Sequence, residues 1–217
     1  MIRKLALFDC DGTLVDSHHS IVESMNDAFA KAGLEPPGAA AIRRVIGLSL
    51  VQSVAVLVPK AGPDLHIQIA EDYKTSFQQL RRNGHVQEPL YDGIVDTLIE
   101  LRDDGWALGV ATGKSDRGLD LCLRHHGIKD WFVTLQTADR HPSKPHPSMV
   151  YEALAEAGAS RDTTIMIGDT SFDIAMARAA GLRALGVDWG YHPAEELRLA
   201  GAYHVAGHPR EVKDLMK

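Results

Sequence analysis

Two aspartates one residue apart, Asp9 and Asp11, follow the short apolar run of residues 5–8. Aspartate is a poor strand former, and its carboxylate is costly to bury without a partner. Other polar side chains follow later apolar segments of the chain: Thr112, Lys114, Lys144, Asp169 and Asp173. Four carboxylates in one place would repel one another, so we expect them to share a cation if they meet. Ligands that are all oxygen atoms favour a hard ion such as Mg²⁺.

This set of side chains suits the hydrolysis of a phosphate ester. Asp9 can attack phosphorus and form an aspartyl phosphate, as carboxylate nucleophiles do. Mg²⁺ and Lys144 would relieve the charge of an anion attacking an anion, and Thr112 would hold the transferring group. Gly113 has no Cβ, so the backbone there could approach the phosphate closely.

Asp11 is the candidate acid and base. It lies two residues from Asp9, and on the same side of the chain if the strand geometry continues. From there it could protonate the leaving alkoxide and then activate water against the phosphoenzyme. Cys10, between the two aspartates, is expected to point the other way.

Short apolar segments alternate with amphipathic ones along most of the chain. The apolar segments predict buried strands at Lys4–Phe8, Trp106–Ala111, Trp131–Leu135, Thr164–Ile167 and Arg183–Val187. The amphipathic segments predict helices at Ile94–Arg102, Asp116–His126, Ser148–Glu156 and Ser171–Ala180. This alternation is typical of β-α-β units, so we expect an α/β fold with a doubly wound, Rossmann-like parallel sheet. Ligands bind such sheets at the carboxyl ends of the strands, where the polar side chains stand.

One region interrupts this alternation, because residues 18–87 contain helical patterns and no convincing strand. Ser20 to Glu23 matches a capping box and would start a first helix that ends near Gly33. Further helices are expected at Ala40–Val45, Ser49–Val58 and Leu65–Arg82, before the turn pairs Asn83-Gly84 and Glu88-Pro89. We therefore predict an α/β core of residues 1–16 and 88–217 and an inserted helical cap of residues 17–87.

Four motifs stand in a set order along the chain. They are Asp9-Cys10-Asp11-Gly12-Thr13-Leu14-Val15-Asp16-Ser17, Ala111-Thr112-Gly113-Lys114, Ser143-Lys144-Pro145-His146-Pro147 and Gly168-Asp169-Thr170-Ser171-Phe172-Asp173. Together they resemble the haloacid dehalogenase-like superfamily of hydrolases, and within it the phosphoglycolate phosphatase-like branch. The stretch 189–191 resembles this branch more weakly.

The resemblance implies a role for each matching residue. Asp9 would be the nucleophile and Asp11 the acid and base. The phosphate ligands would be Thr112 and Lys144. The Mg²⁺ ligands would be Asp9, the carbonyl group of Asp11, Asp169 and Asp173. The insert matches the helical cap of the family in position and size.

The composition excludes several other classes of protein. Hydrophobic residues make up 45% and charged residues 24%, as in ordinary soluble globular proteins. The formal net charge of -6 speaks against a nucleic-acid or anionic-membrane partner. No apolar stretch approaches membrane-spanning length, and the start carries no signal-peptide pattern, so we expect a cytoplasmic protein. We expect a monomer or homodimer that acts on a small phosphorylated metabolite.

The leading interpretation is a Mg²⁺-dependent phosphatase for a small phosphomonoester, with 2-phosphoglycolate as the first candidate. A sugar-phosphate mutase of the same fold is an alternative, because Asp11 and the cap would serve both reactions. A phospho-aspartate signalling module is a third hypothesis, although receiver domains lack such a helical insert. The lifetime of the phosphoenzyme separates the last hypothesis from the first, since a signalling module keeps its phosphoryl group far longer.

Overall fold

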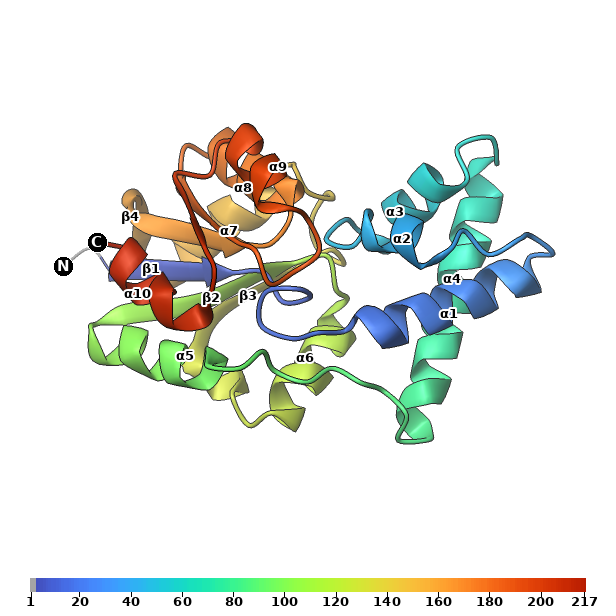
Figure 1. Ribbon diagram of the computed structural model, residues 1–217, viewed down its shortest axis with the longest axis horizontal. Helices are drawn as coiled ribbons and strands as arrows, with labels where there is room; N and C mark the ends of the chain where they lie inside the picture. The colour runs from blue at the N-terminus through green and yellow to red at the C-terminus, as the bar shows by residue number, and fades with distance from the viewer. Residues whose placement is uncertain (1–2) are drawn as a thin grey trace.

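The computed structural model describes residues 3–217 of the chain. A parallel sheet with helices on both faces forms its centre, and a group of helices stands at one end of the molecule (Figure 1). The six strands are arranged in the order β3-β2-β1-β4-β5-β6. Their bounds are β1 (Arg3–Phe8), β2 (Trp106–Thr112), β3 (Phe132–Thr137), β4 (Ala159–Gly168), β5 (Arg183–Val187) and β6 (His204–Ala206).

The helices that flank the sheet follow the strands in sequence. They are α5 (Ile94–Asp103), α6 (Asp116–His125), α7 (Ser148–Ala157), α8 (Ser171–Ala179), α9 (Ala194–Ala200) and α10 (Val212–Leu215), with 3₁₀ turns at Lys129–Trp131 and Pro209–Glu211. The strand order reverses between β1 and β4, which is where ligands bind in open sheets of this kind. The predicted doubly wound, Rossmann-like α/β fold is therefore confirmed.

Strand β1 shows why these segments are apolar along most of their length. Leu5 and Leu7 pack into the core on one face of the sheet. Ala6 and Phe8 pack into the core on the other face, because successive side chains of a strand point in opposite directions. Cys10 continues this second set and is buried in the same core. The prediction that Cys10 points away from its two aspartate neighbours is confirmed.

The insert is a group of helices with an apolar core of its own. The helices are α1 (His18–Lys31), α2 (Ala39–Arg43), α3 (Leu50–Leu57) and α4 (Pro63–Arg82). Met25, Phe29 and Ile69 belong to its core, as expected for a small packed unit. Tyr191, from the loop after β5, joins the same core and so packs the insert against the sheet unit.

The start of α1 differs from the prediction. The helix begins at His18, its N-cap is Ser17, and Ser20 does not form the predicted capping box. The hydroxyl of Ser20 instead accepts a hydrogen bond from Gln87 N–H at 2.8 Å and lies 3.2 Å from the Gln87 carbonyl oxygen. The reason is tertiary, because the chain returns from the insert beside α1 and Ser20 joins the two ends.

Other differences lie near strand and helix ends. The strand predicted from Trp131 begins at Phe132, because Trp131 ends a 3₁₀ turn. Strand β6 and helices α9 and α10 near the end of the chain were not predicted, since each is short and shows no clear apolar pattern. Within the described part of the chain, no helix combines the length and apolar character needed to span a bilayer.

Candidate active site

Asp9 follows the last residue of β1 and is completely buried. Its Oδ1 accepts a hydrogen bond from Cys10 N–H at 2.7 Å and lies 2.9 Å from Lys144 Nζ. Its Oδ2 is buried and has no hydrogen-bond partner among residues 3–217. Burial raises the pKa of Asp9 to about 7; Lys144 acts against this rise and the nearby Asp173 adds to it.

Lys144 bridges two aspartates. Its Nζ lies 2.9 Å from Asp9 Oδ1 and 2.6 Å from Asp173 Oδ1, and its side chain is fully buried. Burial by itself lowers the pKa of a lysine, but Asp173 and Asp9 outweigh this effect and raise the pKa of Lys144. The ammonium group therefore stays charged and can also attract a third anionic group.

Asp169 and Asp173 come from the end of β4 and the first turn of α8. Asp169 Oδ1 accepts a hydrogen bond from the Thr13 hydroxyl at 2.7 Å, and its Oδ2 accepts one from Tyr191 N–H at 2.9 Å. Asp173 Oδ2 accepts hydrogen bonds from the N–H and the hydroxyl of Thr170. The N–H of Asp173 donates in return to the Thr170 hydroxyl, which completes a capping box at the start of α8. Both carboxylates are thus held in fixed directions by the protein.

Two glycines allow the backbone to approach Asp169 closely. A Cβ on Gly12, which has φ +86°, would lie 2.2 Å from Asp169 Oδ2. A Cβ on Gly190 would lie 2.2 Å from the Cβ of Asp169. No side chain fits at either position while Asp169 keeps its place, so both glycines are required for the geometry of this carboxylate.

Asp9, Asp169 and Asp173 form a group that can hold a metal ion. One carboxylate oxygen of each lies within 4.8 Å of the others, and all three residues are buried. The unpartnered Oδ2 of Asp9 and the excess of negative charge fit a hard divalent cation such as Mg²⁺. The carboxylate of Asp11 is not in this group. If Asp11 also binds the metal ion, the ligand atom would have to be its backbone carbonyl oxygen.

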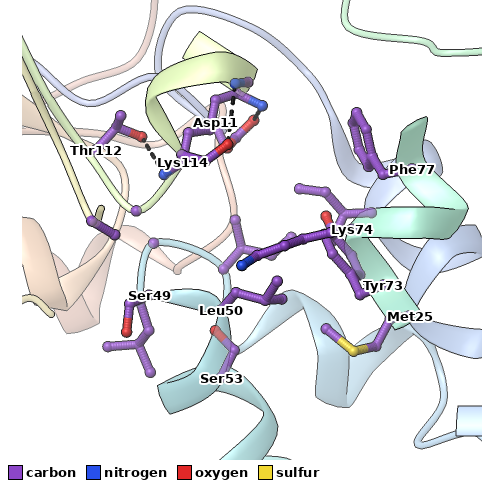
Figure 2. Close-up of a pocket in the computed structure, with 18 of the residues that line it drawn as sticks. Asp11, Met25, Ser49, Leu50, Ser53, Tyr73, Lys74, Phe77, Thr112 and Lys114 are labelled. Carbon is purple, nitrogen blue, oxygen red and sulfur yellow. Dashed lines mark hydrogen bonds and ion pairs between the residues drawn. The ribbon is translucent and has the colours of Figure 1, made fainter. Parts of the chain in front are cut away.

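The carboxylate of Asp11 belongs to a chain of charged side chains. Its Oδ1 lies 2.8 Å from Lys114 Nζ and accepts a hydrogen bond from the Ser17 hydroxyl. Figure 2 shows the side chains of Asp11 and Lys114 next to each other. Lys114 Nζ also lies 2.8 Å from Glu88 Oε1. Glu88 Oε2 in turn lies 2.5 Å from Nη2 of Arg81. The chain therefore connects the last turn of α4 in the insert to the carboxylate of Asp11.

Glu88 is a residue that the sequence reasoning missed. Residues 88–89 were interpreted as a turn, and a glutamate before a proline carries no signal of burial. Its side chain is only 4% exposed. Burial acts to raise the pKa of Glu88, but Lys114 and Arg81 outweigh it and hold that pKa below the usual range. Glu88 is therefore a buried anion that holds two cations in place.

Thr112 and Gly113 lie at the carboxyl end of β2, as predicted. Thr112 is buried, and its hydroxyl accepts a hydrogen bond from Lys114 N–H at 3.3 Å. Gly113 was expected to leave room for phosphate. A Cβ there would lie 2.4 Å from the carbonyl oxygen of Leu48 and 2.8 Å from that of Gly47, and the approach of phosphate stays a prediction. The missing side chain of Gly113 thus makes room for the α2–α3 loop of the insert.

Polar contacts also join the insert to the sheet unit. Ser49 N–H donates to the hydroxyl of Ser143 at 2.8 Å, next to Lys144. The guanidinium of Arg44 makes two hydrogen bonds, of 2.9 and 2.7 Å, to the carboxylate of Glu196. Between the insert and the strand ends remains a cavity of about 520 Å³, part of which Figure 2 shows.

The sequence of residues 6–187 matches the protein family described as haloacid dehalogenase-like hydrolase. This chain belongs to that family. A relative named "Probable phosphatase IndB", from Dickeya dadantii (strain 3937), is 34% identical to this hydrolase over 204 residues, which cover 92% of this chain and 87% of the relative. The family match over residues 6–187 contains all four motifs, from Asp9 to Asp173, and the predicted family is confirmed.

Two further comparisons cover almost the whole chain. The phosphoglycolate phosphatase of Vibrio vulnificus (strain CMCP6) is 29% identical to this hydrolase, over 98% of this chain and 96% of the relative. The solved structure of a haloacid dehalogenase-like family hydrolase from Streptococcus pneumoniae superposes with a TM-score of 0.86 at 25% identity, covering 99% of each chain. The similarity therefore extends over both the sheet unit and the helical insert of this hydrolase.

Proposed function

We propose that this hydrolase removes the phosphoryl group from a small phosphomonoester in a Mg²⁺-dependent reaction that passes through an aspartyl phosphate on Asp9. The observation that carries the proposal is the state of the Asp9 carboxylate. One oxygen is held by Cys10 N–H and Lys144, while the other has no hydrogen-bond partner among the described residues. A carboxylate held in this way is oriented for attack on phosphorus and keeps an oxygen available for a cation.

Three carboxylates and a carbonyl group would hold the metal ion. These ligands are Asp9, Asp169, Asp173 and the carbonyl of Asp11. When bound, Mg²⁺ would neutralise negative charge on the phosphoryl oxygens. Lys144 would add a second positive charge, and Thr112 would hold the transferring group through its hydroxyl.

The protein's own groups account for both steps of the reaction. Asp9 attacks phosphorus, the bond between phosphorus and the alcohol oxygen breaks, and Asp11 donates a proton to the leaving alkoxide. Asp11 then takes a proton from a water molecule, whose oxygen attacks the aspartyl phosphate. This second step releases inorganic phosphate and restores the carboxylate of Asp9.

We assign residues 17–87 to a cap domain and residues 1–16 and 88–217 to the catalytic core. The contacts of the insert with Ser143 and Gly113 support this assignment, because they bring it over the strand ends. Such a cap excludes bulk water and admits only small esters. 2-Phosphoglycolate is the first compound to test, since several relatives are named phosphoglycolate phosphatase. The expectation of a cytoplasmic monomer or homodimer stays a prediction.

Phosphate release from 2-phosphoglycolate and other esters, measured with and without Mg²⁺, tests the proposal. Asp9→Asn should leave no turnover, whereas the exposed Asp162→Asn should have no effect. In Asp11→Asn, rapid-quench trapping with borohydride should find the phosphoryl group on Asp9. A fully active Asp9→Asn enzyme would contradict the mechanism. Transfer back to bound substrate without phosphate release would favour the mutase, and a long-lived phosphoenzyme the signalling module.

A further inference from the structure

The cavity of about 520 Å³ is continuous with the proposed catalytic site. Asp9, Asp11, Thr112 and Gly113 line one side of it, and α3 and α4 of the insert face them (Figure 2). A phosphoryl group held at Asp9 would have its ester substituent in this space, because this is the cavity that Asp9 lines. Cavities of this size bury ligands much larger than a two-carbon acid.

The wall of the cavity is largely apolar. Leu50 at the start of α3 and Phe77 on α4 line it from the insert, and Leu121 of α6 lines it from the core. All three are only half-buried, while Met25 and Ile42 in the same lining are buried. Three helices therefore present uncovered apolar surface to one concave space, and such surface is stabilised by an apolar ligand.

The positive charges of the lining are already paired or lie at the solvent. Arg81 and Lys114 both pair with Glu88, and Lys74 pairs with Glu71 at 2.7 Å. The remaining cations of the lining are exposed: Arg82 and Arg117. A small phosphorylated acid would thus find no unpaired buried cation among the lining residues to bind its carboxylate.

We propose that the preferred substrate is a phosphomonoester whose alcohol carries an apolar or aromatic body, which packs against Leu50, Phe77 and Leu121. This inference rests on the proposed phosphatase function and specifies the substrate class of the same site. On this inference, the site prefers esters with an apolar or aromatic body to 2-phosphoglycolate and other small phosphorylated acids.

A series of n-alkyl phosphates tests this inference, because the leaving alcohols differ in apolar length and hardly in acidity. We expect kcat/KM to rise about fourfold for each added methylene, the equivalent of about 0.8 kcal/mol. Hexyl phosphate, with four more methylenes, should then exceed ethyl phosphate by about 250-fold, and should exceed 2-phosphoglycolate. A flat or falling series, or 2-phosphoglycolate as the better substrate, overturns the inference and leaves the proposed function intact. If no ester releases phosphate, both this inference and the proposed phosphatase function are overturned.

Two variants of α3 locate the effect in the cavity. Leu50→Asn should lower the ratio of hexyl to ethyl phosphate by about tenfold. Val56→Asn changes an exposed residue of the same helix that does not line the cavity, and should leave the ratio unchanged. If Leu50→Asn does not fold, Phe77→Asn provides the same comparison. An unchanged ratio in a folded Leu50 or Phe77 variant would overturn the assignment of the binding surface.

The chain of charges from Arg81 to Asp11 carries a second inference independently of the cavity. The structure assigns Glu88 as a positioning residue for Asp11. Glu88 Oε1 lies 2.8 Å from Lys114 Nζ, which lies 2.8 Å from Asp11 Oδ1, so the buried glutamate fixes the ammonium group that holds the proposed acid and base. Through Arg81, the same glutamate ties this position to α4 of the insert.

The dependence of turnover on the leaving group tests this role. An alkoxide leaving group needs the proton of Asp11, whereas p-nitrophenolate hardly does. Glu88→Gln should therefore lower kcat for hexyl phosphate by about 10²-fold. For p-nitrophenyl phosphate, it should lower kcat by less than about tenfold. KM should change little, and Glu88→Asp should restore part of the loss. Glu195→Gln, at an exposed ion pair with Arg198 on α9, is the matched control. Equal losses for both esters, or none, would overturn the inference.

Discussion

The metal-free protein should become more stable when Asp9 loses its charge. Burial raises the pKa of Asp9 from 3.8 to about 7 in the folded protein, so ionising this carboxylate at alkaline pH costs about 4 kcal/mol of folding free energy. Asparagine resembles the protonated carboxyl group and avoids this cost. In the metal-free state, Asp9→Asn should therefore raise the free energy of unfolding by about 4 kcal/mol above pH 7, or about 8–16 °C in Tm.

The pH dependence identifies the cause of the difference. Because the folded pKa of Asp9 is raised, the destabilisation is absent below the unfolded pKa of 3.8 and complete above about 7. The stability difference between the variant and the parent should grow by about 1.4 kcal/mol per pH unit in this window and then level off. Thermal denaturation in EDTA between pH 5 and pH 8 measures this difference.

Two controls complete the experiment. Asp162→Asn, which removes an exposed carboxylate, should show little change at any pH. Mg²⁺ should stabilise the parent protein and should stabilise Asp9→Asn less, because one ligand has lost its charge. A stability difference that does not vary with pH, or an Asp9→Asn protein less stable than the parent at pH 8, would refute the reasoning.

Three further outcomes follow from the site. Lys144→Met should abolish turnover. It should also lower the free energy of unfolding by about 3–5 kcal/mol in a denaturant titration, because Asp9 and Asp173 lose the buried cation between them. A variant as stable as the parent would contradict this. Gly113→Ala should lower kcat/KM about tenfold, mainly through a higher KM. The reason is that the added Cβ would lie 2.4 Å from the carbonyl oxygen of Leu48 when the insert is in place. Unchanged kinetics would show that this close contact is not needed. Chelation should abolish phosphate release and Mg²⁺ should restore it, with Ca²⁺ a poor substitute; full turnover in excess EDTA would exclude a metal requirement.

Local sequence patterns were sufficient to predict five of the six strands, the helical insert and the position of the polar residues after the strands. Strand β1 is apolar at every position from Leu5 to Phe8 because helices cover both of its faces, and this pattern is visible without a structure. The same periodicity of two separates Cys10 from Asp9 and Asp11. Since parallel strands end at one edge of the sheet, their order along the chain was enough to predict that Asp9, Lys144 and Asp169 meet.

Only the tertiary structure decided which partner each polar side chain has. Asp11 and Lys114 belong to the first and second motifs. Their ion-pair chain with Glu88 depends on how the chain returns from the insert, and no local pattern reports this. Gly113 faces the backbone of Leu48 for the same reason. The cavity likewise forms between helices far apart in the sequence. Periodicity records which face of an element is buried, whereas the neighbour that buries it is chosen by packing between distant segments.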